Sequence, residues 1–206
     1  MPRKRVLMIL ERIEWTYTWR EDCTVPAPRV LLIGDSITNG YKSVAHKNLA
    51  GRAGVTAYAT SKAIDNPFLW DEIVLLAKQE NMEYAAIQVN NGLHFGGLSV
   101  EEYENHYSTL VENLKNAFPH TPMILALSTP ITENGNGEKF AASNDAVIEK
   151  NAAVLRIAEK YGLPVRDLYS LVAGKSHIRS ADGYHYNAEG YELLGGYVAE
   201  GILSLL

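Results

Sequence analysis

Short runs of apolar residues alternate along the chain with longer segments in which apolar residues recur at helical spacing. The short runs predict five strands, and the longer segments predict the helices between them. We expect strands at residues 30–33, 55–60, 84–89, 123–127 and 164–167, and helices at 36–49, about 67–79, 99–118, about 141–161 and after residue 187. This alternation predicts an α/β fold, with a mostly parallel five-stranded sheet that helices cover on both faces.

Several predicted helix ends are marked by residues that cap or stop helices. Ser99 stands at a predicted N-terminus, and Glu102 three residues later completes a capping box. Gly162 ends the helix before it, and Asn187 is placed to cap the last helix. The polar residues 133–137 predict a loop. The last helix carries a broad apolar face made of Leu193, Leu194, Tyr197, Val198, Ile202 and Leu203.

The length of 206 residues suits one domain with a core large enough to be stable alone. Residues 1–28 form a mixed segment that contains three aromatic residues and closes with two prolines. We interpret this segment as an N-terminal arm packed on the domain, which residues 29–206 form. The aromatic residues Trp15, Tyr17 and Trp19 are expected to be buried against the core rather than to hold a ligand.

The composition excludes several classes of function. Acidic and basic residues are interspersed, the formal net charge is −5, and no basic patch interleaves with aromatic residues, so nucleic acid is not an expected partner. Cys23 is the only cysteine, which excludes an intrachain disulfide and a thiolate-rich metal site. The apolar stretch near the start ends at Glu11, short of the ~7 residues that a signal peptide needs, and no run reaches membrane-spanning length. We expect a cytoplasmic protein without a membrane partner, and the sequence does not indicate its oligomeric state.

The first predicted strand leads directly into residues that can carry chemistry. Residues 30–40 read Val-Leu-Leu-Ile-Gly-Asp-Ser-Ile-Thr-Asn-Gly, so Ser36 follows the strand at the start of a helix. Functional sites of parallel sheets lie beyond the carboxyl ends of the strands. A serine there can act as a nucleophile if a base is near, and its N–H at a helix N-terminus favours a developing oxyanion. The alternative is that Ser36 only caps the helix.

A candidate base and a candidate carboxylate occur together near the carboxyl end, in Asp182-Gly183-Tyr184-His185. An imidazole can take the proton of a serine hydroxyl and pass it to a leaving group. On a tight turn, a carboxylate three residues earlier lies beside the imidazole and orients it. Ser36, His185 and Asp182 are therefore the candidates for nucleophile, base and orienting carboxylate.

Other catalytic motifs are absent or incomplete. The sequence has neither the Gly-x-Ser-x-Gly elbow nor the zinc motif His-Glu-x-x-His. Gly174-Lys175-Ser176 resembles the end of a phosphate-binding loop, but Tyr169 occupies the place of its first glycine. A metal site is a minor alternative, for which the candidate ligands are Asp35, His94, Asp182 and His185.

Together, Gly34-Asp35-Ser36 and Asp182-Gly183-Tyr184-His185 resemble the first and last sequence blocks of the SGNH, or GDSL, hydrolases. The resemblance covers about residues 29–206. It implies a flavodoxin-like, three-layer α/β/α fold in which Ser36, His185 and Asp182 are catalytic. It also implies hydrolysis of acyl esters without a cofactor, usually the removal of acetyl or longer acyl groups from sugars, lipids or other alcohols.

The two middle blocks depart from the pattern of these hydrolases. After the second strand, members supply the N–H of a glycine to the oxyanion, and here Ser61 stands in its place with an N–H of its own. After the third strand, members have Gly-x-Asn-Asp, and here Gly92 aligns with the glycine and His94 with the asparagine. The side-chain donor to the oxyanion is then His94, or alternatively Asn90 or Asn91.

We therefore expect a serine esterase that removes a small acyl group, such as acetyl, from a carbohydrate or similar alcohol through an acyl-enzyme. One alternative is a non-catalytic, flavodoxin-like module that binds phosphate or sugar with its loop amides. Another is a metal-dependent phosphoesterase. Asp35 is expected to hold backbone amides of neighbouring loops.

Overall fold

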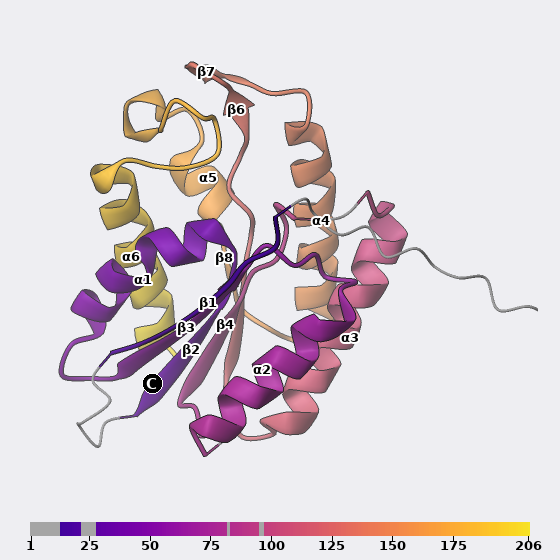
Figure 1. Cartoon of the computed structure of the whole chain (residues 1–206), viewed down its shortest axis with the longest axis vertical. Helices are drawn as coiled ribbons and strands as arrows, with labels where there is room; N and C mark the ends of the chain where they lie inside the picture. The colour runs from indigo at the N-terminus through magenta and orange to yellow at the C-terminus, as the bar shows by residue number, and fades with distance from the viewer. Residues whose placement is uncertain (1–12, 22–27, 82, 95–96) are drawn as a thin grey trace, which may run out of the picture.

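In the computed structural model, a central sheet lies between two layers of helices (Figure 1). The structure describes residues 13–21, 28–81, 83–94 and 97–206, so the basic start of the chain, Cys23 and Pro26 lie outside the described residues. The strands are β1 (Thr16–Arg20), β2 (Arg29–Gly34), β3 (Gly54–Thr60), β4 (Ala86–Val89), β5 (Met123–Ala126), β6 (Thr132–Glu133), β7 (Asn136–Phe140) and β8 (Val165–Arg166). The α-helices are α1 (Ser36–Leu49), α2 (Pro67–Gln79), α3 (Val100–Ala117), α4 (Asn144–Tyr161), α5 (Leu168–Val172) and α6 (Ala188–Leu203).

The described part of the central sheet has six strands in the order β1-β3-β2-β4-β5-β8. The last five are parallel, and their order is that of flavodoxin-like folds. β1 pairs antiparallel with β3, from Thr16 opposite Thr60 to Arg20 opposite Thr56. The predicted flavodoxin-like α/β/α fold is confirmed, but the predicted number of five strands is wrong. The sixth strand escaped prediction because it lies at the sheet edge, where exposed residues replace an apolar run.

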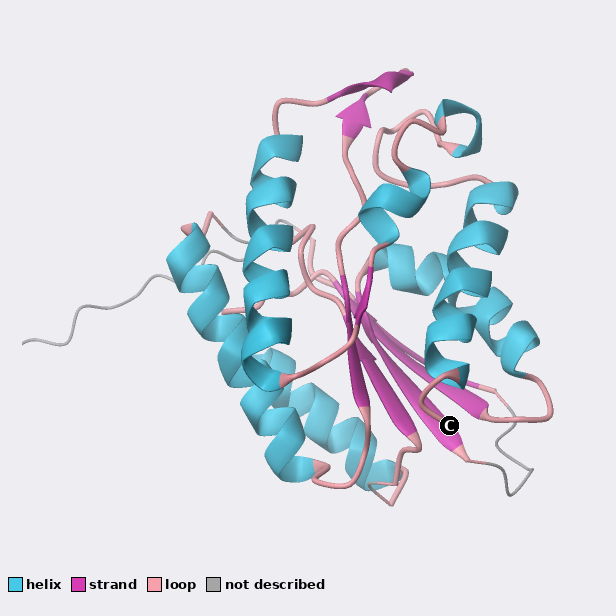
Figure 2. Ribbon diagram, turned by 180° about the vertical axis from the view of Figure 1, so that it is seen from behind, coloured by secondary structure: helices cyan, strands magenta, loops and turns pink. Residues whose placement is uncertain are grey.

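Burial on both faces explains the continuous apolar run of β2. Val30 and Leu32 pack into the core on the side of α1 and α6, whereas Leu31 and Ile33 pack into the core on the side of α2, α3 and α4. The two helical layers flank the sheet in the view from behind (Figure 2). Because successive side chains of a strand point to opposite faces, a buried central strand requires apolar residues at every position.

The helices α1 and α6 pack closely against each other. Ser36 begins α1, and the turn with Asp182 and His185 precedes α6, so this packing brings distant parts of the sequence together. A Cβ on Gly195 of α6 would lie 2.5 Å from Val44 Cβ, and a Cβ on Gly40 of α1 would lie 2.1 Å from the Tyr191 ring. Glycine at these two positions lets the helices approach closely. The start of α1, which follows β2, therefore lies near the turn that precedes α6.

The predicted helix ends are confirmed. Ser99 and Glu102 form the reciprocal capping box of α3, Gly162 ends α4 in a left-handed conformation with φ of 64°, and the Asn187 side chain caps α6. The β6–β7 hairpin and α5 were not predicted, because a short hairpin of mostly exposed, polar residues and a five-residue helix carry little periodicity. No helix in the described ranges is long and apolar enough to cross a membrane.

Candidate active site

Ser36 lies at the turn between β2 and α1. The N-cap of α1 is Asp35, whose carboxylate accepts the Ile37 N–H at 2.9 Å. Ser36 is therefore the first residue of the helix and not its cap, and its hydroxyl is available to another partner. Gly34 keeps the turn tight, since a Cβ there would lie 2.0 Å from Thr38 Oγ1. Asp35 holds amides of its own helix, and not those of neighbouring loops as predicted.

Ser36, His185 and Asp182 form a row of two hydrogen bonds. Ser36 Oγ is 2.9 Å from His185 Nε2, and His185 Nδ1 is 2.6 Å from Asp182 Oδ2. A carboxylate only accepts, so Nδ1 carries a hydrogen and Nε2 accepts the Ser36 hydroxyl proton. The His185 and Asp182 side chains are 40% and 50% exposed, so the row is open to solvent. In this arrangement an imidazole can remove the proton of a serine hydroxyl.

The turn at residues 182–185 holds Asp182 charged. Its Oδ1 accepts the N–H groups of Tyr184 and His185, both at 2.9 Å. Partial burial alone would raise the pKa of Asp182, but the hydrogen bonds from the His185 N–H and imidazole and from the Tyr184 N–H outweigh it, and the pKa is lowered. The same carboxylate thereby fixes the backbone of the turn and orients the imidazole.

Arg179 and the segment at the start of β6 brace this turn. The Thr132 N–H donates to the Gly183 carbonyl at 2.9 Å. The Arg179 guanidinium donates to the same carbonyl at 3.0 Å and to the Pro130 carbonyl at 2.7 Å. Sequence reasoning missed Arg179, because no motif marks an arginine whose hydrogen bonds here go to main-chain carbonyls. Its contacts join the end of β5 to the loop that carries the imidazole.

Ser61 does not offer the N–H that was predicted for it. That N–H donates to the Trp15 carbonyl at 3.1 Å, and the Ser61 hydroxyl accepts the Trp15 N–H at 3.0 Å. The pairing of β1 with β3 thus continues one residue beyond Thr60, and the Ser61 N–H is used in it. The prediction missed this because it did not foresee a strand beside β3.

Asn90 is also occupied within the fold. Its amide donates to the Ala126 carbonyl at 2.8 Å and to Ser128 Oγ at 3.3 Å, so both of its hydrogens serve the junction of β4 with β5. Gly92 serves the same junction, because a Cβ there would lie 2.0 Å from Ser128 Oγ. Of the predicted donors, Asn90 is therefore structural, and Gly92 is needed for close packing.

Asn91 reaches across the carboxyl end of β2. Its side-chain amide donates to the Lys62 carbonyl at 2.9 Å, with the residue only 4% exposed. Lys62 follows β3 and Asn91 follows β4, whereas β2 lies between these strands, which are therefore roughly 10 Å apart. The bond thus links the loops on either side of the strand that leads to Ser36, and the second amide hydrogen of Asn91 has no acceptor among the described residues.

His94 lies close to Asp35, the residue before Ser36. Burial raises the pKa of Asp35, and the charge of His94 lowers it more strongly than the charge of His185 does. The His94 imidazole is thus within electrostatic range of the carboxylate that caps α1. The Trp15 ring meets the imidazole edge-on, with centroids 6.4 Å apart. Ser61 and Asn90 thus use their donors within the fold, and Asn91 and His94 remain the candidates for the side-chain donor to the oxyanion.

The described residues contain no cluster of three or more His, Cys, Asp or Glu side chains arranged to hold a metal ion. The four predicted candidate ligands are instead used in the hydrogen bonds of the serine row, in the cap of α1 and beside it. The metal site stays a prediction without support in this geometry.

A flavodoxin-like sheet with a serine, a histidine and an aspartate in a row at its carboxyl edge defines a serine hydrolase. The chain belongs to the GDSL-like lipase/acylhydrolase family, whose sequence profile matches residues 32–193. It is accordingly a carboxylic ester hydrolase, and the alternative of a non-catalytic binding module is not favoured.

Solved structures share this fold at low sequence identity. An acetylxylan esterase, Axe2 from Geobacillus stearothermophilus, is 18% identical with a TM-score of 0.68, over 85% of this chain and 94% of the other. A lipase/acylhydrolase from Enterococcus faecalis is 20% identical with a TM-score of 0.66, over 86% and 96%. An acetyl xylan esterase, AlAXEase, is 14% identical with a TM-score of 0.67, over 84% and 98%. No curated protein sequence matches this chain.

Proposed function

We propose that Ser36 is the nucleophile of ester hydrolysis, His185 its general base and acid, and Asp182 the carboxylate that orients the imidazole. The observation that carries the proposal is the row of hydrogen bonds of 2.9 and 2.6 Å that joins them. Ser36 Oγ attacks the ester carbonyl while its proton passes to Nε2, and Nε2 then protonates the departing alcohol. Water, activated by the same nitrogen, hydrolyses the acyl-enzyme and releases the carboxylic acid.

The oxyanion of the tetrahedral intermediate is proposed to bind three donors. One is the N–H of Ser36 in the first turn of α1, where the helix dipole favours negative charge. The second is the remaining amide hydrogen of Asn91, and the third is the imidazole of His94. Loss of one such donor typically lowers turnover by about 100- to 1000-fold.

The proposed substrate is a small acyl group, such as acetyl, on a carbohydrate or similar alcohol. The exposure of His185 supports a bulky leaving group, because the alcohol must stand next to Nε2 and this side of the row is open to solvent. Two similar structures are acetylxylan esterases, which supports acetyl on a sugar by analogy of fold.

The replacement Ser36→Ala tests the chemistry. Removal of a serine nucleophile alone is expected to lower kcat by about a million-fold, while the melting temperature stays near that of the wild type. Hydrolysis of p-nitrophenyl acetate measures kcat, and mass spectrometry after treatment with a serine-directed phosphonate detects the adduct. Turnover by the S36A variant at the wild-type rate, or a wild type that forms no adduct at Ser36, contradicts the proposal.

A panel of esters tests the substrate. We expect kcat/KM to fall from p-nitrophenyl acetate to the palmitate ester, and acetylated xylo-oligosaccharides to be deacetylated. Faster hydrolysis of the long-chain esters would contradict the small acyl group without affecting the role of Ser36.

A further inference from the structure

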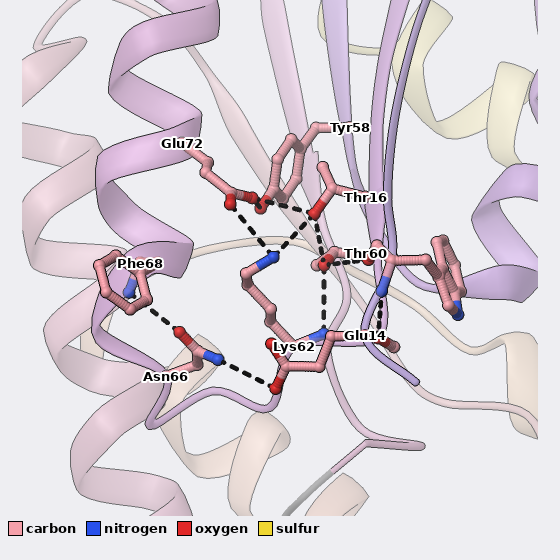
Figure 3. Close-up of polar contacts among 10 residues, drawn as sticks. Glu14, Thr16, Tyr58, Thr60, Lys62, Asn66, Phe68 and Glu72 are labelled. Carbon is pink, nitrogen blue, oxygen red and sulfur yellow. Dashed lines mark hydrogen bonds and ion pairs between the residues drawn. The ribbon is translucent and has the colours of Figure 1, made fainter. Parts of the chain in front are cut away.

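An ion pair between a buried lysine and a partly exposed glutamate fastens the loop that follows β3 (Figure 3). Lys62 Nζ lies 3.1 Å from Glu72 Oε1 on α2, and it donates to Thr16 Oγ1 on β1 at 2.9 Å. The Lys62 side chain is only 10% exposed. Lys62 thus joins the loop to a helix and to the edge strand.

Glu72 is held by neutral donors as well. It accepts the Tyr58 hydroxyl at 2.7 Å and the Thr16 hydroxyl at 3.0 Å. Partial burial would raise the pKa of Glu72, but the hydrogen bonds from Tyr58, Lys62 and Thr16 outweigh it and lower the pKa. The carboxylate therefore stays charged at neutral pH, and removal of either partner leaves a poorly compensated charge behind.

The main chain of Lys62 links the ion pair to the Asn91 side chain. Its N–H donates to Thr60 Oγ1 at 3.1 Å, and its carbonyl accepts the Asn91 amide at 2.9 Å. This bond joins the loops that follow β3 and β4, the two strands that flank β2, and β2 leads into the turn of Ser36. A displacement of the Lys62 carbonyl therefore moves or frees the Asn91 carboxamide.

A second ion pair also fastens the edge strand to α2. Arg20 of β1 also binds the end of α2, through Glu80 at 2.6 Å. Glu80 in turn accepts the hydroxyls of Thr56 and Tyr84, both at 2.7 Å. β1 is thus fastened to α2 by the Arg20–Glu80 ion pair at one end, and at the other end by the Thr16 hydroxyl, which binds both Lys62 and Glu72. The Lys62–Glu72 pair is the one that lies at the carboxyl end of β3, beside Asn91.

We propose that Lys62 is a positioning residue for ester hydrolysis: anchored by Glu72, it uses its carbonyl to hold the Asn91 carboxamide in place to bind the oxyanion. This inference rests on the proposed function and on the place of Asn91 in it. Lys62 does not touch the ester itself, so its effect must pass through the carboxamide.

The replacements Lys62→Met and Glu72→Gln, made in the full chain, test this role. With p-nitrophenyl acetate we expect kcat to fall by roughly 10- to 100-fold, because a misplacement of about 1 Å can cost 100-fold. KM should change by less than about twofold, since an oxyanion donor acts in the transition state and not on the bound ester. A trifluoromethyl ketone adds to serine as an oxyanion, so its affinity should fall by the same factor as kcat/KM.

The double variant with Asn91→Ala shows whether Lys62 acts through Asn91. In the N91A background, K62M is expected to lower kcat by less than about twofold, because the group it positions is gone. Glu80→Gln is the matched control, as it weakens the Arg20–Glu80 ion pair, which also fastens the edge of the sheet to α2. We expect E80Q to lower the melting temperature about as much as E72Q and to leave kcat unchanged.

Three results would overturn the inference: wild-type kcat in a folded K62M variant, equal losses of kcat in E72Q and E80Q, or an undiminished effect of K62M in the N91A background. If K62M does not fold, E72Q, which keeps the shape of the side chain, carries the same comparison. Failure of the proposed function is distinct, because it would appear as equal activity of wild type and S36A.

Discussion

Replacing Gly183 by alanine is expected to damage catalysis far more than it damages the fold. Gly183 lies in the turn that carries Asp182 and His185, with φ of 79°, and a Cβ there would lie 2.2 Å from the Thr132 carbonyl oxygen. Real Cβ contacts with backbone begin near 3.0 Å. The turn must therefore move away from Thr132 by about 1 Å, a displacement that can lower the rate by roughly 100-fold.

The loss of stability is separable from this displacement. Alanine in a left-handed conformation costs about 1 kcal/mol, which lowers the melting temperature of a chain of this size by about 2–4 °C. Gly162→Ala is the matched control, because Gly162 has φ of 64° with no atom within 4 Å of an added Cβ and ends α4. G162A should lose the same stability and keep wild-type turnover.

Steady-state hydrolysis of p-nitrophenyl acetate and thermal melts of both variants measure the two effects. We expect kcat of G183A to fall by roughly 100-fold at temperatures well below its melting point. Equal turnover by G183A and G162A would refute the reasoning, because it would show that the turn tolerates the shift without moving His185 from Ser36.

Three further substitutions give separate readouts. Asp35→Asn should keep the helix cap and raise the melting temperature at pH 7. Burial raises the pKa of Asp35 in the folded state, so the wild-type protein loses stability as the pH rises and this carboxyl group ionises. The gain in melting temperature should therefore shrink towards pH 4, and a gain that is independent of pH would count against this reasoning. Asp182→Asn should lower kcat by about 10,000-fold, while its remaining carbonyl still accepts the Tyr184 N–H and keeps the melting temperature above that of Asp182→Ala. Ser99→Ala should cost about 1 kcal/mol of unfolding free energy through loss of the capping box with Glu102, with kcat unchanged.

The buried parallel strands and the long helices were predictable, because each carries a periodic pattern or a capping residue. The helices predicted at 36–49 and 67–79 coincide with α1 and α2. β1 and the β6–β7 hairpin were not predictable in this way. Both are exposed on one side, so few of their residues are selected for burial, and their pairing depends on distant segments.

Some residues of the candidate site could likewise be predicted from the sequence, and others could not. The serine and the Asp-x-x-His turn were recognisable, because their spacing follows from local chain geometry and the fold brings the ends together. The candidate donors to the oxyanion were recognisable only in part. Asn91 and His94 were among the predicted candidates, but the sequence did not show that the Ser61 N–H binds Trp15 and that the Asn90 amide binds the end of β5. The Arg179 guanidinium donates to main-chain carbonyls, and a sequence pattern does not reveal such partners.

β1 also protects one edge of the sheet from pairing with other molecules. Without this strand, the N–H and C=O groups along the outer side of β3 would form an open edge, able to pair with a strand of a neighbouring molecule. The bonds of Trp15 and Arg20 at its two ends hold the cover in place. A substitution that peels β1 away is therefore expected to cause edge-to-edge aggregation, visible as turbidity during storage or heating.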